Sequence, residues 1–136
     1  MYEVFEHTAD IGLRVRAPDL NALFAEAGRG LFSLIVENLD EVQPQQELTV
    51  RLAGEDRELL LFDWLNELLF QFDAHHLVFS RFQVAVDEGG LTATVAGEPV
   101  DPARHRLDHE VKAITYHGLK VAQEPGGWVA EVIVDI

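Results

Sequence analysis

Apolar and polar positions alternate in short runs near both ends of the chain, and this alternation predicts β-strands. In residues 11–16, for example, Ile11, Leu13 and Val15 alternate with small or charged residues. The turn signal at 124–127 (EPGG) predicts that the last two strands form a hairpin. The predicted strands cover residues 2–5, 11–16, 47–53, 78–86, 91–97, 111–122 and 128–136.

The hydrophobic period changes to that of a helix in two intervening segments. The first begins after Asp19, a residue suited to cap a helix, and continues to Ile35. The second covers residues 56–75, where Leu60, Trp64 and Leu68 form one stripe and further leucines widen it. A helix this apolar is expected to be covered on more than one side.

The order of these elements predicts an α+β fold. Two helices lie between an early group of strands and a late run of four. Packing both helices on a mostly antiparallel sheet buries the apolar faces of each, which gives a two-layer sandwich. The 136 residues fit a single domain, 1–136, with a core large enough to fold without cross-links.

Composition removes several classes of site. The chain has no cysteine, which excludes disulfides, thiolate zinc sites, iron–sulfur clusters and cysteine nucleophiles. The N-terminus lacks the basic and apolar regions of a signal peptide, and the longest apolar stretch is interrupted by polar residues. We therefore expect a cytoplasmic protein that does not enter a membrane.

The charge balance indicates which partners suit the protein. Ten Lys and Arg residues against 24 Asp and Glu residues give a net charge of -14. Strong direct binding of nucleic acid requires a basic face, so it is not expected. A basic protein partner or a cation is the better electrostatic match. Acidity that serves only solubility is the alternative.

The end of the chain carries a candidate metal site. In the last strand Asp135 is adjacent to the terminal carboxylate of Ile136, and Asp10 lies in a turn before an early strand. If these two strands are neighbours, three oxygen groups converge, and hard cations such as Ca²⁺ or Mg²⁺ prefer such ligands. The alternatives are a solvated chain end for Asp135 and an ordinary turn residue for Asp10.

Other reactive side chains give weaker signals. Lys112 lies on a predicted strand and can be a catalytic amine, an anion contact or a charge that protects a sheet edge. The histidine pairs His75–His76 and His105–His109 do not have the spacing of a zinc site. No Gly-rich phosphate loop or nucleophile elbow is present, so an autonomous enzyme is not expected.

Four segments in order resemble the archease family and together cover essentially the whole chain. They are HTADIGL at 7–13, LLLFDWLNELLF at 59–70, EVKAITYHGLKV at 110–121 and GWVAEVIVDI at 127–136. The resemblance implies an α/β sandwich with a curved sheet and two helices. It also implies a protein partner, the RNA-splicing ligase of tRNA splicing, whose guanylylation and multiple turnover archeases promote without being ligases themselves.

The resemblance further implies site residues. The family's metal site, seen with calcium, corresponds here to Asp10, Asp135 and Ile136, and magnesium and manganese are the alternative cations. Lys112 is similar to a lysine tied to activity in the family. Two other functions remain open at this stage: a metal-dependent phosphoester hydrolase, and a chaperone-like interaction module for which the metal is unimportant.

Overall fold

The computed structural model describes residues 1–7 and 10–136, and within them the chain forms two α-helices, one 3₁₀ turn and eight strands. The helices are α1 (Leu20–Ile35) and α2 (Arg57–His75), and the 3₁₀ turn η1 is Leu39–Glu41. The strands are β1 (Tyr2–His7), β2 (Asp10–Ala17), β3 (Gln46–Ala53), β4 (Leu77–Asp87), β5 (Gly90–Pro99), β6 (Ala113–Ile114), β7 (Lys120–Glu124) and β8 (Gly127–Asp135).

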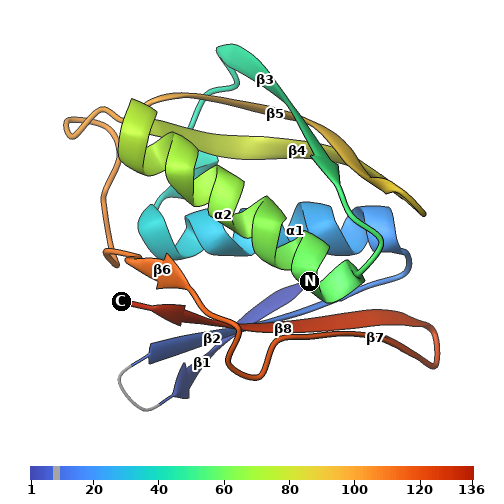
Figure 1. Ribbon diagram of the computed structural model, residues 1–136. Coiled ribbons are helices and arrows are strands. Elements are labelled where there is room, and N and C mark those ends of the chain that lie inside the picture. The colour runs from blue at the N-terminus through green and yellow to red at the C-terminus, as the bar shows by residue number, and fades with distance from the viewer. Residues whose placement is uncertain (8–9) are drawn as a thin grey trace.

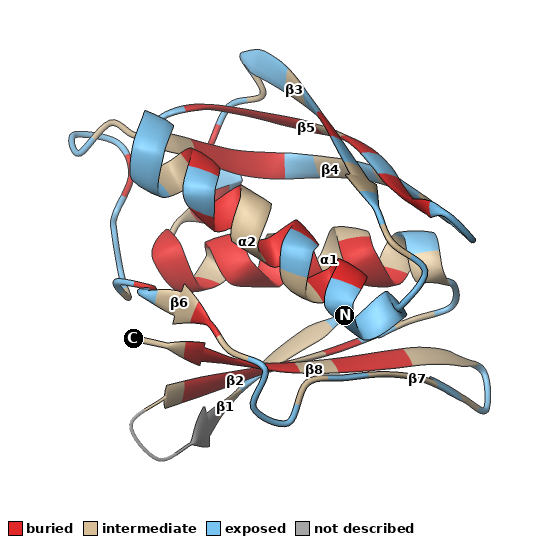
Figure 2. Cartoon of the chain, viewed as in Figure 1, coloured by how far each residue is buried: buried red, intermediate tan, exposed pale blue. Residues whose placement is uncertain are grey.

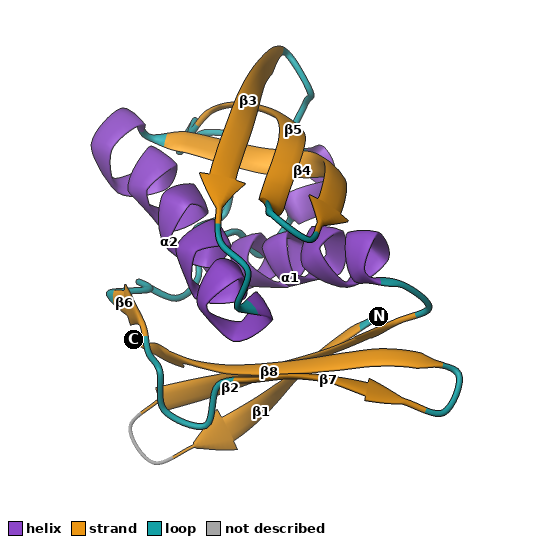
Figure 3. Ribbon diagram, turned by 45° about the vertical axis from the view of Figure 1, so that its right-hand side comes forward, coloured by secondary structure: helices purple, strands orange, loops and turns teal. Residues whose placement is uncertain are grey.

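The strands divide into two sheets with the helices between them (Figure 1). One sheet has the order β1-β2-β8-β6, with β7 also paired to β8, and the other has the order β3-β5-β4. Every named strand pair is antiparallel. The α+β class with two helices on mostly antiparallel strands is therefore confirmed. The division into two sheets places the helices in a central layer (Figure 3).

Both helices begin at aspartate caps. The carboxylate of Asp19 accepts a hydrogen bond from the amide of Ala22 at 2.8 Å, as expected from the sequence. At α2 the carboxylate of Asp56 accepts from the amides of Glu58 and Leu59. The residue that caps the C-terminus of α2 is His76, whose φ of 57° is left-handed. None of the helices in the described ranges combines the length and apolarity needed to cross a bilayer.

The core lies where the helices meet the two sheets (Figure 2). Leu13 of β2, Leu31 of α1, Leu65 of α2 and Val95 of β5 are all fully buried in one cluster. The indole N–H of Trp64 donates to the carbonyl of Phe24 at 2.8 Å, so the largest core side chain is also satisfied. Burial of α2 from two sides explains why its apolar stripe is so wide.

The continuous strand predicted over residues 111–122 is wrong, because only Ala113–Ile114 and Lys120–Glu124 pair with β8. Between them the chain turns at Gly118, where φ is 66°. The ring of Tyr116 stacks on Phe62 of α2, with centroids 3.9 Å apart. The segment therefore leaves the sheet to contact the helix, which local periodicity does not reveal.

Candidate functional site

Asp10 and Asp135 lie directly opposite each other in the first sheet. The strands β2 and β8 pair antiparallel in a register that runs from Asp10↔Asp135 to Ala17↔Trp128. Opposed residues in an antiparallel pair have Cβ atoms roughly 4.5–5.5 Å apart and share one face. Asp10 and Asp135 are thus neighbours in the sheet although 125 positions separate them in sequence.

The face on which the two aspartates lie is the one turned away from the helices. In β2 the buried positions Ile11 and Leu13 face the core. Side chains alternate along a strand, so Asp10 lies on the opposite side. In β8 the core positions are Val132 and Val134, which gives Asp135 the same orientation. Both aspartates are half-buried and open to solvent.

The chain end is held on both sides at this point. Asp135 pairs with Asp10 of β2 on one side and with Ala113 of β6 on the other. The amide of Lys112 donates to the carbonyl of Asp135 at 2.8 Å. Ile136 is half-buried, and its side chain packs against the core. The terminal carboxylate is therefore attached to an anchored strand.

Lys112 enters the site through its backbone. The same hydrogen bond to Asp135 fixes the position of its main chain beside the last strand. Its side chain is exposed and forms no ion pair with any residue that the structure describes. The ammonium group is therefore available to an external anion.

The charged pairs between β2 and β8 differ along the two strands. Four residue pairs along from Asp10 and Asp135, Arg14 forms an ion pair with Glu131 at 2.9 Å, so opposite charges face each other there. At the Asp10–Asp135 pair, by contrast, two carboxylates lie opposite each other, an arrangement that a cation or a hydrogen-bond donor stabilises. Oxygen donors of this kind fit a hard divalent cation.

Within residues 1–7 and 10–136, no group of three or more His, Cys, Asp or Glu side chains is placed to hold a metal. The expected set has two carboxylate side chains and takes its third group from the main-chain terminus. The sequence-predicted residues Asp10, Asp135 and Ile136 thus come together, with Lys112 adjacent.

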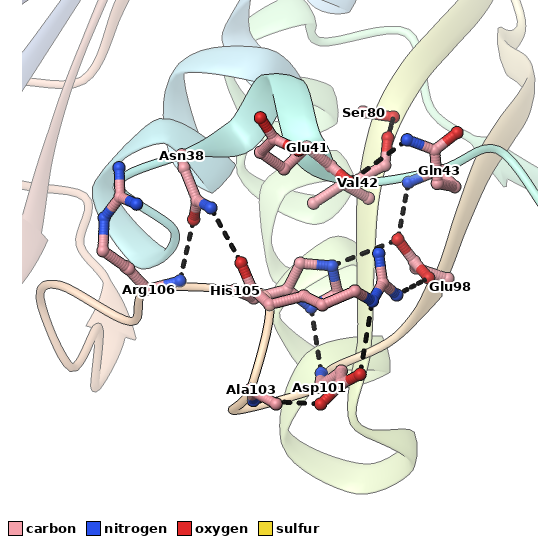
Figure 4. A network of polar contacts seen from close by, with 11 residues as sticks. Asn38, Glu41, Val42, Gln43, Ser80, Glu98, Asp101, Ala103, His105 and Arg106 are labelled. Atoms are coloured by element: carbon pink, nitrogen blue, oxygen red, sulfur yellow. Dashed lines mark hydrogen bonds and ion pairs between the residues drawn. The ribbon is translucent and has the colours of Figure 1, made fainter.

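A second polar cluster was missed by the sequence analysis (Figure 4). Glu98, at the end of β5, is only 2% exposed and lies within bonding distance of three groups. Its carboxylate accepts from the backbone amide of Gln43 at 2.6 Å, from the ring of His105 at 3.1 Å and from the guanidinium of Arg104. The available signal was a single acidic residue just beyond the predicted strand 91–97.

The hydrogen bonds of this cluster determine the protonation of its members. The amide of Asp101 donates to Nδ1 of His105, so the neutral ring carries its proton on Nε2 and donates it to Glu98. Burial alone would raise the pKa of Glu98, but the bonds from Arg104, Gln43 and His105 outweigh it and lower the pKa. The cluster ties the connection after β5 to the segment after α1, a structural role.

The cavities lie elsewhere. One of about 440 Å³ is lined by Arg29, Arg81, Phe82 and neighbouring residues of the second sheet. None of Asp10, Lys112, Asp135 and Ile136 contributes to its wall. The candidate site at the end of the first sheet is therefore separate from this cavity.

Comparison with known proteins gives a consistent result over the whole chain. The model of the archease protein family matches residues 2–136. Protein archease of Methanopyrus kandleri is 45% identical over 99% of both chains, and that of Pyrococcus furiosus is 39% identical over 99% of this chain and 98% of its own.

Solved structures show the same fold. The solution structure of protein 1598 of Methanobacterium thermoautotrophicum has a TM-score of 0.87 at 37% identity, covering 99% of this chain and 98% of its own. A crystal structure from Thermotoga maritima, described as an archease and possible chaperone, has a TM-score of 0.69 at 22% identity. It covers 100% of this chain and 98% of its own.

Proposed function

This chain belongs to the archease family, and we propose that it is a cytoplasmic, metal-binding accessory protein that activates a tRNA-splicing RNA ligase. In this proposal it promotes guanylylation of the ligase and its multiple turnover and joins no RNA itself. The ligase is its protein partner.

The observation that carries the proposal is the register of β2 and β8, in which Asp10 is opposite Asp135 beside the chain end. The two carboxylates and the terminal carboxylate of Ile136 form an all-oxygen donor set. Ca²⁺ prefers such donors, and Mg²⁺ and Mn²⁺ also take them. We expect the three groups to hold one divalent cation, most simply Ca²⁺.

Strand pairing fixes the backbone positions of the two aspartates at this site. Asp10 and Asp135 belong to paired strands, so their backbones are preorganised before any ligand arrives. A bound cation would supply positive charge against the phosphates of a nucleotide during guanylylation. Lys112, exposed just before the neighbouring strand β6, supplies a second positive charge that can reach an anion at the same surface.

Overall charge supports a basic protein partner. With a net charge of -14 the chain repels RNA. It attracts a basic protein surface of the kind that binds RNA phosphates. Complementary potentials of this kind raise the rate of encounter and orient the partners. The acidic domain would dock near the nucleotide site of the ligase, with Asp10, Asp135 and Lys112 toward it.

The proposal is tested by multiple-turnover ligation with the partner ligase, comparing the wild type with Asp10→Asn, Asp135→Asn and Lys112→Met. Each variant should lose most of the stimulation, whereas ligation in a single turnover by ligase already guanylylated should be unchanged. Asp73→Asn, which changes an exposed aspartate of α2, is the matched control. Full stimulation by Asp135→Asn would rule out the metal-site proposal.

A variant with one glycine added after Ile136 tests the role of the terminal carboxylate. It moves that group by one residue and leaves both aspartates and the core in place. Calorimetric titration with Ca²⁺ should show weaker binding than in the wild type. Unchanged stimulation of the ligase by the extended chain would favour a general interaction module, and phosphoester hydrolysis by the purified chain alone would favour a hydrolase.

A further inference from the structure

The strand β3 has an open hydrogen-bonding edge. It lies at the border of the second sheet, whose order is β3-β5-β4 (Figure 3). In the described part of the chain its only backbone partner is β5. An edge of this kind is a template on which a further strand can pair.

The opposite border of the same sheet is closed by α1. The amide of Val86 on β4 donates to the side chain of Asn21 at 2.8 Å, and the carbonyl of Ser80 accepts from Arg29 at 3.1 Å. Two helix side chains thus satisfy strand groups that would otherwise face solvent. No corresponding side-chain bond to β3 is found among the described residues, so its edge is the one left for a partner.

We propose that β3 pairs antiparallel with β3 of a second copy of this chain, about a twofold axis through Thr49. Such an axis is perpendicular to the sheet and keeps equivalent faces together. It places Glu47 opposite the partner's Arg51, and Arg51 opposite the partner's Glu47. The two three-stranded sheets then join into one continuous sheet.

The charges of β3 select this register. Glu47, Thr49 and Arg51 are exposed on one face of the strand, and neither charged residue forms an ion pair with a described residue. If the axis passes through residue 48 or 50 instead, neither Glu47 nor Arg51 lies opposite a residue of opposite charge. With the axis at Thr49, two opposite-charge pairs form across the new strand pair, an arrangement that stabilises sheets.

The other face of β3 is also self-complementary. Val50 is buried, whereas Leu48 and Leu52 at the border are half-buried and pack against the core. In the same register Leu48 faces the partner's Val50, so the apolar row continues between subunits. At the borders of the first sheet, β1 carries no Lys or Arg and lacks this complementarity, and the amide of Val121 in β7 already donates to the side chain of Glu58 in α2.

The experiment is sedimentation analysis over a hundredfold range of protein concentration up to millimolar, in enough salt to screen the repulsion between two acidic chains. The average mass should rise toward twice the chain mass of 15.2 kDa. Glu47→Arg and Arg51→Glu should each weaken association about tenfold, because each makes both cross-strand pairs like-charged. The double variant, whose net charge equals that of the wild type, should restore it.

The control for the single variants is Asp73→Arg, which makes the same charge change as Glu47→Arg on an exposed position of α2 and should leave association unchanged. A second measurement needs no variant: exchange of the β3 amides should slow as protein concentration rises. A monomer at every concentration, or association that the single exchanges leave intact, would overturn the proposal. Neither result bears on the Asp10–Asp135 site, which lies on the other sheet.

Discussion

At the scale of single residues, Glu98 illustrates how a buried charge can be accommodated. Its carboxylate is 2% exposed yet accepts bonds from Gln43, Arg104 and His105. Removing one partner from a buried charged group commonly costs more than an ordinary hydrogen bond, because the remaining groups lose both water and partner. Glu98 therefore links the connection after β5 to the segment after α1, in addition to the β-bridge between Val36 and Leu107.

The variant Glu98→Gln should lower the free energy of unfolding by about 2 kcal/mol at neutral pH. Because the pKa of Glu98 is lowered in the folded state, its stabilising contribution is fully present above its unfolded pKa, near 4.5, and is lost as pH falls through the folded value. Urea unfolding between pH 7 and pH 3 measures this. The difference from the wild type should shrink only on the acid side, and a difference that grows with falling pH would contradict it.

Gly97 is a second residue whose role is set by its surroundings. A Cβ atom at this position would lie 1.8 Å from the carbonyl oxygen of Val78, which is backbone and cannot swing aside. Gly97 pairs with Phe79 where the β4–β5 register shifts by one residue, between Phe79 and Arg81. The bulge brings the two strands too close for any side chain.

Gly97→Ala should therefore destabilise the fold by about 1–3 kcal/mol, the usual cost of forcing extra volume into a packed site. Chemical unfolding followed by circular dichroism measures the change. Gly89→Ala is the control, since a Cβ there meets only the Asp87 side chain, at 3.6 Å. Equal stability of the two variants would show that β4 and β5 can move apart at residue 97 without loss of folding free energy.

At the scale of elements, the start of α2 depends on its cap. The side chain of Asp56 satisfies the amides of Glu58 and Leu59, which have no partner within the helix. Asp56→Ala should lower the free energy of unfolding by about 1 kcal/mol. The neighbouring exposed Glu55→Ala is the control and should change it little; thermal unfolding distinguishes the two.

Elements also show where periodicity was informative and where it was not. The two helices and the β7–β8 hairpin were predicted because their signals are local: a cap, a 3.6-residue period and a Gly-rich turn. The break after β6 was missed because the stacking of Tyr116 on Phe62 joins residues 54 positions apart. A contact between residues so far apart in sequence cannot be predicted from the hydrophobic pattern of a short segment.

At the scale of the whole molecule, a net charge of -14 acts on folding as well as on partners. A compact acidic chain repels itself, and salt screens this repulsion. Raising ionic strength from about 0.01 to about 0.15 M shortens the Debye length from about 30 to about 8 Å.

The melting temperature of the metal-free protein, kept dilute, should rise over this range in NaCl. Differential scanning calorimetry with a chelator present measures it, and choline chloride at equal ionic strength is the control for specific binding of sodium. A melting temperature that falls with salt would mean that attractive ion pairs such as Arg14–Glu131 outweigh the net repulsion.

The amino-acid sequence by itself determined the fold class, both helices and the Asp19 cap, and it predicted Asp10, Asp135 and Ile136 as a set of oxygen groups. These features depend on the local spacing of residues and on side-chain chemistry, and both can be determined directly from the sequence. Only the tertiary structure decided that the strands form two sheets and that Asp10 is opposite Asp135. Strand register is a long-range property, since it is set when segments from opposite ends of the chain bury their apolar faces together.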